Sequence, residues 1–287
     1  MSKLNLIIAV YLTVILSACS NFNATDLNPY FIDLSEPSIA TIPVQGKDTH
    51  KIRDAWVFTQ DQELGPFEVP VKIPILEEGE SSDLVIFPGI RENGREAVPI
   101  IYPYIEPIQI SVDAVPGETY PIDLEFQYYD NVKFPFVEDF SGSHTFVLES
   151  DDFEGSNLTV VSDPLDPTMT NKVARLNVDQ QNPVCEIYTS SLFLPSDFNN
   201  NAYLEINYSS DTPLTLGVMQ TIGSYQIPEY IILLNPKPLG NKLYLDLSSI
   251  LNDPNIGQFS LLLNVSLEGS TVASGEVFVD DIKLIHL

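Results

Sequence analysis

Proline and glycine interrupt this chain so often that few long regular elements can form in it. Its 22 prolines and 14 glycines separate short runs rich in Val, Ile, Leu, Phe and Tyr. These runs recur about every ten residues, the spacing typical of a β-sandwich. Long stretches of helical periodicity are absent, and the one helix candidate is a single turn at Leu247 to Leu251. The sequence therefore predicts an all-β protein.

The clearest strand pattern lies near the middle of the chain. After the Pro116-Gly117 turn, apolar and polar residues alternate over nine positions. Because successive side chains of a strand point to opposite faces, this alternation predicts one packed and one solvated face. The residues expected on the packed face are Tyr120, Ile122, Leu124, Phe126 and Tyr128.

The amino-terminal 19 residues have the features of an export signal. One charge, Lys3, precedes an apolar run from Leu4 to Leu16, and small residues then lead to Cys19. The run is shorter than the roughly 18 residues that a membrane-spanning helix needs. A cleaved signal peptide over residues 1–19 is therefore predicted.

The Leu-Ser-Ala-Cys sequence at Leu16 to Cys19 resembles the lipobox of bacterial lipoproteins. The resemblance implies that Cys19 carries acyl chains and anchors the protein to the outer membrane of a bacterial envelope. The segment Ser20 to Ala24 lacks the acidic cluster that often marks export to the outer face in Bacteroidota-type lipoproteins, so the periplasmic and surface faces both stay open. The alternative is an ordinary signal peptide that contains a cysteine.

Charge excludes some partners. The chain has 13 Lys and Arg against 40 Asp and Glu, a net charge of −27. Without the leader, which holds one Lys and no acid, the balance is 12 minus 40, or −28. Such a surface disfavours nucleic acid and anionic lipid, and it suits divalent cations. If Cys19 is lipidated, Cys185 has no disulfide partner, and its strand-like context predicts a small buried residue rather than a nucleophile.

The chain divides into four parts on this reading. The leader, residues 1–19, is followed by a polar, proline-punctuated tether over residues 20–50, by a first sandwich domain over residues 51–131 and by a second over residues 136–287. Prolines in the strand expected from Pro66 to Leu76 place it at a sheet edge, because proline cannot donate to a β-ladder.

Two resemblances refine the fold. The stretches Ile52 to Phe58, Leu64 to Pro70 and Ile86 to Ile90 resemble a domain of Bacteroidota surface lipoproteins, which implies an immunoglobulin-like sandwich and no known activity. The second half looks like a galactose-binding-like jelly roll, the architecture of many carbohydrate-binding modules. The segments that carry this second resemblance are Glu138 to Phe140, Tyr203 to Tyr208, Leu243 to Leu247 and Val277 to Leu284.

The jelly-roll resemblance implies a metal site. In that family the first and last strands are neighbours, and acidic residues on them often hold a structural calcium ion. The matching residues here are Glu138, Asp139, Asp280 and Asp281. Clustered carboxylates repel one another unless a hard cation neutralises them, so calcium is physically reasonable. The alternative is that these acids face water.

A glycan site would need aromatic rings together with polar groups that bind hydroxyls. The candidate ligand-binding residues are Tyr188, Tyr203, Tyr208, Tyr225, Tyr230, Asn200 and Asn201. Tyrosine is also common in strands for packing reasons alone, and the only tryptophan, Trp56, lies in the first half.

Catalytic signatures are missing from the sequence. The histidines lie in the expected tether, a loop and the C-terminus: His50, His144 and His286. No serine or cysteine stands in a nucleophile-elbow context, and no phosphate loop or zinc-ligand spacing occurs. We therefore predict a non-catalytic, lipid-anchored envelope protein that binds glycans or glycoconjugates through its second domain. The alternatives are a structural or assembly lipoprotein that docks a protein partner through sheet edges or the proline-rich strand, and an enzyme acting on a glycan or ester.

Overall fold

A computed structural model describes most of the chain from residue 28 onward. The described residues are 28–60, 62–76, 80–148, 157–162, 172–193, 201–223, 225–252, 256 and 258–287. The predicted signal peptide, the predicted lipidation site Cys19 and the candidate ligand residue Asn200 lie outside them.

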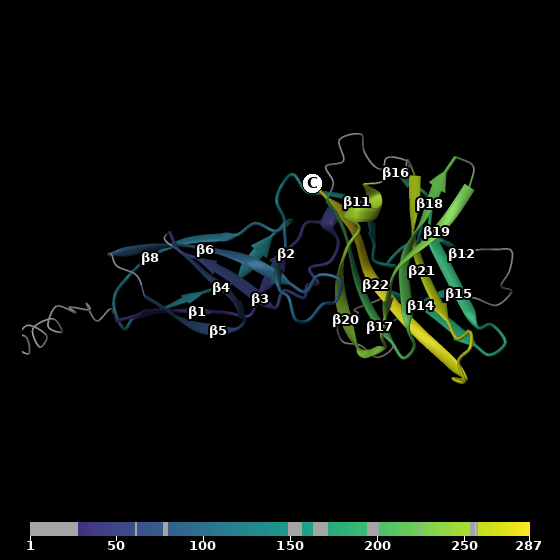
Figure 1. Ribbon diagram of the computed structural model, residues 1–287, viewed down its shortest axis with the longest axis horizontal. Helices are drawn as coiled ribbons and strands as arrows, with labels where there is room; N and C mark the ends of the chain where they lie inside the picture. The colour runs from purple at the N-terminus through teal and green to yellow at the C-terminus, as the bar shows by residue number, and fades with distance from the viewer. Residues whose placement is uncertain are drawn as a thin grey trace, which may run out of the picture.

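The described chain is almost entirely β-strand and forms two sandwiches arranged along the long axis of the molecule (Figure 1). The all-β prediction of two sandwich domains is therefore confirmed. The only α-helix in the described segments is α2, Ser248–Leu251, which falls within the single turn expected from the sequence. In the described segments no helix has the length and apolar character needed to cross a membrane.

The first sandwich is built from ten strands and the short 3-10 helix η1 (Pro43–Gln45). One sheet has the order β5-β1-β9, a second pairs β10 with β2, and a third has the order β4-β3-β6 with β7 and β8 both paired to β6. The strands are β1 (Tyr30–Leu34), β2 (Ser38–Ala40), β3 (Asp54–Phe58), β4 (Glu63–Glu68), β5 (Val71–Ile75), β6 (Ser81–Ile90), β7 (Ile100–Ile101), β8 (Ile108–Asp113), β9 (Thr119–Ile122) and β10 (Glu125–Gln127).

The alternation predicted around β9 and β10 is confirmed. Ile122, Leu124, Phe126 and Tyr128 are at most 4% exposed, whereas the intervening residues are exposed. This stripe closes the core of the first sandwich.

The predicted tether over residues 20–50 is wrong for its described part. Strand β1 lies in the middle of its sheet, where Ile32 pairs with Ile73 of β5 and Tyr120 of β9 and is fully buried. Strand β2 likewise pairs with β10. The alternation in Tyr30 to Leu34 is too short to stand out among polar residues and prolines, yet long-range pairing is enough to order it.

The predicted strand at Pro66 to Leu76 is two strands that belong to different sheets. Strand β4 ends at Glu68 and β5 begins at Val71. Each lies at the edge of its sheet, as the prolines required.

The second sandwich has two main sheets. The junction sheet has the order β13-β14-β22-β17-β20, with β11 also paired to β22, and the outer sheet has the order β12-β15-β21-β18-β19, with β16 also paired to β21. The strands are β11 (Lys133–Glu138), β12 (Phe146–Leu148), β13 (Asn157–Ser162), β14 (Lys172–Asp179), β15 (Val184–Thr189), β16 (Leu192–Phe193), β17 (Ala202–Ser210), β18 (Leu214–Ile222), β19 (Tyr225–Leu234), β20 (Lys237–Asp246), β21 (Gln258–Ser266) and β22 (Ser274–His286).

A single apolar core fills the space between these two sheets, including Ile206, Leu216 and Leu261. Cys185 of β15 belongs to this core and is fully buried, as predicted. The first and last strands, β11 and β22, are antiparallel neighbours, which agrees with the jelly-roll expectation.

The junction sheet is covered on both faces around β17. Tyr203, Tyr244 and Ile285 point away from the second core and join the core of the first sandwich. All nine residues of β17 are buried as a result. The carboxyl terminus also lies at this junction (Figure 1). The outer sheet is the one whose outward face the first sandwich does not cover, and it is therefore the better candidate for ligand contact.

Candidate functional site

Four outward residues form one row across the outer sheet. Tyr188 of β15 pairs with Leu262 of β21, Leu262 pairs with Gly217 of β18, and Gly217 pairs with Tyr230 of β19. We call this set the tyrosine row. At a strand spacing of about 4.8 Å it is about 14 Å long and has a tyrosine at each end.

Gly217 fits its place in the row because the site is crowded. A β-carbon there would lie 2.4 Å from the backbone oxygen of Glu229. Strand β19 has a bulge at this point, between the residues that pair with Leu216 and Gly217. The glycine therefore lets the backbone of β19 approach β18 where Tyr230 enters the face.

A polar row lies next to the tyrosine row. Glu186 of β15 pairs with Asn264 of β21, and Asn264 pairs with Thr215 of β18. The Tyr230 hydroxyl donates to Glu186 Oε2 at 2.7 Å, and Asn264 Nδ2 donates to the same oxygen at 2.8 Å. Tyr230 thus reaches across two intervening strands, and its ring remains 52% exposed.

These rows place apolar and polar groups side by side. Leu262 and Met219, 1% and 5% exposed, form a covered floor, while the two tyrosines stand at the ends. Glu186 is buried, so its hydrogen bonds form in surroundings of low dielectric constant and are strengthened there. The arrangement can present a ring face and a fixed carboxylate to one ligand.

Of the seven predicted ligand residues, the structure brings together Tyr188 and Tyr230. Tyr225 also lies on β19 and is 73% exposed, but it is five residues from Tyr230 and so points to the other side of the strand. Asn201 is exposed just before β17. Asn200 falls outside the described residues.

The prediction that Tyr203 and Tyr208 form ligand platforms is wrong. Tyr203 is 6% exposed, and its ring lies 5.6 Å and 5.5 Å, centroid to centroid, from those of Tyr102 and Tyr104 in the first sandwich. Tyr208 is 2% exposed and accepts a hydrogen bond from Asn241. Both lie on β17, but Tyr203 faces the core of the first sandwich, whereas Tyr208 faces the core of the second. Strand-level reasoning could not show that both faces of this strand are covered.

The four predicted calcium ligands do not form one acidic cluster. Glu138 accepts hydrogen bonds from the backbone of Phe140 and Thr145, and Asp139 accepts them from Ser141. Within the described part of the chain, no group of three or more His, Cys, Asp or Glu side chains is placed to hold a metal ion. The calcium site predicted at these residues is therefore not supported by their geometry.

Lysines supply the counter-charge for the other two acids. Asp280 forms an ion pair with Lys47 at 2.6 Å, and Asp281 lies 3.5 Å from Lys242 and 3.7 Å from Lys283. Lys47 comes from the segment that the sequence assigned to a tether. Lysines thus provide the charge compensation expected from a cation: Asp280 receives it across the junction, and Asp281 receives it within the second sandwich.

Glu205 is the centre of this buried network, and sequence analysis missed it. Its carboxylate accepts hydrogen bonds from Tyr102 at 2.8 Å and Tyr128 at 2.9 Å, and Lys242 Nζ lies 2.9 Å away. Glu205 is 1% exposed and Lys242 is 7% exposed. The available signal was a charged residue within an apolar strand, which Glu205 and Lys283 both show.

Asp280 should make the free energy of unfolding decrease as the pH rises. Burial raises its pKa from 3.8 to about 6, despite the hydrogen bond and ion pair from Lys47. The folded state therefore binds this proton more tightly than the unfolded state, and the resulting stability is lost as pH rises through about 6. Relative to the wild type, Asp280→Asn should gain about 2 to 3 kcal/mol between about pH 4 and 7.

Urea unfolding of both proteins across that pH range measures the difference. A difference that does not change with pH would show that Asp280 titrates normally.

Comparison with known proteins gave structural neighbours only. No protein-family model matches the chain, and no curated protein sequence matches it. The family 11 carbohydrate-binding module of the cellulosomal cellulase Lic26A-Cel5E of Clostridium thermocellum has 15% identity and a TM-score of 0.40, over 55% of this chain and 97% of that chain. The family 30 module of the cellulosomal cellulase Cel9D-Cel44B of the same organism has 18% identity and a TM-score of 0.35, over 53% and 96%.

Two further structural neighbours are of other kinds. A mutant of the family 29 carbohydrate-binding module CBM29-2 has 10% identity and a TM-score of 0.34, over 55% of this chain and 91% of that chain. The enzymatically active domain of tailspike protein 4 of bacteriophage CBA120 has 15% identity and a TM-score of 0.31, over 49% and 19%. Similarity at this level assigns no function to the chain, so function has to be argued from its side chains.

Proposed function

We propose that this chain is a non-catalytic, saccharide-binding protein that binds its ligand on the outward face of the outer sheet. The observation that carries the proposal is the tyrosine row together with Glu186 and Asn264 beside it. Sugars present both C–H surfaces and hydroxyl groups, and this face offers rings for the first and a carboxylate and an amide for the second.

The arrangement of acids favours binding over hydrolysis. Glycosidases commonly use two carboxyl groups placed about 5 to 10 Å apart on either side of the scissile bond. Among the described residues that form the tyrosine row and the polar row, Glu186 is the one carboxylate. Its bonds to Tyr230 and Asn264 hold it as an acceptor for ligand hydroxyls.

The proposal includes a location in the bacterial envelope. The apolar run from Leu4 to Leu16 and the lipobox-like segment ending at Cys19 support export and lipid anchoring. Radiolabelled palmitate should be incorporated into the wild type and lost from Cys19→Ser. Equal labelling of the two proteins would remove the anchor from this proposal.

Glycan binding is tested with the full-length chain on a glycan array. Removing a stacking ring should weaken binding to an array hit about tenfold or more, since about 1.4 kcal/mol corresponds to a factor of ten. Tyr230→Ala and Tyr188→Ala should both show this loss. Tyr225→Ala is the matched control, because Tyr225 is also exposed on β19 but lies off the row.

Two results would count against a saccharide ligand on this face. One is an array with no hit at all. The other is an equal loss of binding for Tyr225→Ala and Tyr230→Ala, which would place the site elsewhere on β19.

A protein-docking role is the second candidate, and an exposed edge favours it. Strand β19 ends the outer sheet. Tyr225 and Leu233 on β19 and Leu239 on the following strand β20 are 73%, 63% and 90% exposed. Unpaired edges with apolar side chains are places where other chains add. A silent array, combined with capture of one envelope protein that Leu239→Glu abolishes, would favour this role.

A further inference from the structure

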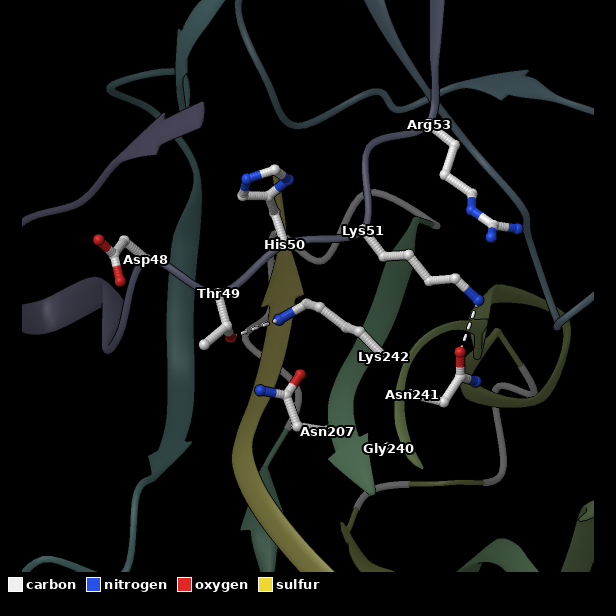
Figure 2. Close-up of a pocket in the computed structure, with 9 residues that line it drawn as sticks. All are labelled: Asp48, Thr49, His50, Lys51, Arg53, Asn207, Gly240, Asn241 and Lys242. Carbon is white, nitrogen blue, oxygen red and sulfur yellow. Dashed lines mark hydrogen bonds between the residues drawn. The ribbon is translucent and has the colours of Figure 1, made fainter. Parts of the chain in front are cut away.

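A second candidate site lies in a cavity of about 500 Å³ where the two sandwiches meet (Figure 2). We call it the junction cavity. Its volume lies in the usual range for small-molecule sites. The segment that links η1 to β3 forms one wall, and β17 together with the edge strand β20 forms the other. The lining residues are Asp48, Thr49, His50, Lys51, Arg53, Asn207, Gly240, Asn241 and Lys242.

The lining is polar and cationic in a strongly acidic protein. Three of the chain's 13 Lys and Arg residues line this one cavity, against a single acid, Asp48. Aromatic and large aliphatic side chains are not among the lining residues. A ligand suited to this cavity is therefore compact, polar and negatively charged rather than apolar.

Lys242 is already used by the protein. Its Nζ lies 2.9 Å from Glu205 and 3.5 Å from Asp281, and it donates to Thr49 at 3.2 Å. Its charge is thus balanced inside the buried network. The cationic groups that can bind a ligand are therefore Lys51 and Arg53.

Lys51 and Arg53 share one carboxylate. Glu96 lies 2.8 Å from Arg53 and 3.6 Å from Lys51, and Lys51 also donates to Asn241 at 2.5 Å. Glu96 carries one negative charge, whereas Lys51 and Arg53 carry two positive charges. This group of three therefore has a net charge of +1. Burial lowers the pKa of Lys51, with smaller contributions from Arg53 and Lys237, and Glu96 only partly offsets it.

His50 does not add to this charge at neutral pH. Burial, followed by the nearby Lys242, lowers its pKa below 6.5. At about pH 7 its imidazole is therefore neutral, and it lines the cavity as a hydrogen-bonding group.

The inner wall holds a buried acceptor with no donor. Asn207 is 5% exposed, and its Oδ1 has no hydrogen-bond partner among the described residues. Figure 2 shows its amide extending from β17 toward Lys242 and Thr49. A buried carbonyl oxygen without a donor costs free energy, and a ligand hydroxyl that donates to it would remove that cost.

We propose that the junction cavity binds an acidic sugar, with its carboxylate on Lys51 and Arg53 and a hydroxyl donating to Asn207 Oδ1. A uronic acid carries both groups on one small ring. The net charge of −27 disfavours long polyanions, so a single or terminal acidic unit is the form that fits. This site is separate from the tyrosine row and does not depend on it.

Sodium glucuronate is the probe, and glucose is its neutral match. Isothermal titration of the full-length chain should give glucuronate at least about tenfold tighter binding than glucose, because only glucuronate has the carboxylate. Raising NaCl from about 50 mM to about 500 mM should weaken glucuronate binding, because salt screens the attraction between its carboxylate and the side chains of Lys51 and Arg53. Sodium acetate, which has the charge but no hydroxyl, should bind less tightly than glucuronate.

Variants locate the site. Lys51→Met and Arg53→Gln should each weaken glucuronate about tenfold, and Asn207→Ala should weaken it while leaving acetate unchanged. Lys72→Met is the matched control, because Lys72 pairs with Thr119 on the first sandwich, away from the cavity, and should bind as the wild type does. Arg53 is half exposed, so its variant remains informative if Lys51→Met folds poorly.

Equal binding of glucose and glucuronate, or no binding of either, overturns the proposal. So does an equal loss in Lys72→Met and Lys51→Met. Tyr230→Ala should bind glucuronate normally, so failure of the junction cavity and failure of the outer-sheet site give different results.

Discussion

Replacing Glu205 with alanine is expected to lower the free energy of unfolding by about 3 to 5 kcal/mol, the cost of breaking a buried ion pair. The substitution leaves Lys242, 7% exposed, without its nearest carboxylate. It also leaves the hydroxyls of Tyr102 and Tyr128 without their acceptor. Each of these groups is buried, so water cannot replace the lost partner at low cost.

The stability lost in Glu205→Ala should depend on pH. Burial raises the pKa of Glu205, but the charges of Lys242 and Lys283, together with the hydrogen bonds from Lys242 and Tyr102, outweigh burial and lower the pKa below 4.5. A carboxylate of this kind stabilises the fold above its ordinary pKa, and the stability is lost as pH falls through the lowered value. The gap between wild type and Glu205→Ala should therefore narrow at acid pH.

Urea unfolding at about pH 7 measures this cost, with Glu125→Ala as control because Glu125 is an exposed glutamate on β10. The control should stay within about 0.5 kcal/mol of wild type. The double variant Glu205→Leu, Lys242→Met should recover much of the loss, since removing both charges leaves no isolated ion. A cost for Glu205→Ala no larger than that of the control would mean that the network contributes little.

Replacing Tyr102 with alanine is expected to cost about 3 to 5 kcal/mol, the range for large-to-small aromatic substitutions in a core. Tyr102 is fully buried, and its ring lies 5.0 Å from that of Tyr244 and 5.6 Å from that of Tyr203, centroid to centroid. Both partners belong to the second sandwich. The variant should therefore lose contacts between the sandwiches as well as contacts within the first core.

The specific effect expected of Tyr102→Ala is that the two sandwiches unfold in separate transitions. Trp56 is the only tryptophan and lies in β3, so its fluorescence reports the first sandwich, whereas circular dichroism reports both. In the wild type the two probes should give one coincident transition, and in Tyr102→Ala they should separate. Tyr102→Phe removes only the hydroxyl that donates a hydrogen bond to Glu205, so the free energy of unfolding should fall by a smaller amount, about 1 to 3 kcal/mol. Coincident transitions in Tyr102→Ala would show that the sandwiches are held together elsewhere.

Local sequence patterns predicted the fold class well. The proline and glycine punctuation and the alternation from Tyr120 to Tyr128 predicted strands with one packed face, and burial follows that alternation. The same reasoning placed Cys185 in a core. These features depend on the two-residue period of a strand, which is visible in the order of neighbouring residues.

The candidate site was only partly predictable. Tyrosines 188, 203, 208 and 230 look alike in the sequence, because each lies in a strand-like run. Tyr188 and Tyr230 share a row on an uncovered face, whereas Tyr203 packs into the core of the first sandwich and Tyr208 into the core of the second. Side-chain alternation says that two residues face opposite sides of a strand, but it does not say what covers each side.

By itself, the sequence determined that the chain folds as two β-sandwiches and which residues of each strand share a face, because proline, glycine and side-chain alternation act on the backbone locally. Only the tertiary structure decided that Lys47 would neutralise Asp280 and that Glu205 would meet Tyr102. These partners are 233 and 103 residues apart along the chain. Charge pairing at that separation depends on which sheets meet, and no local pattern carries that information.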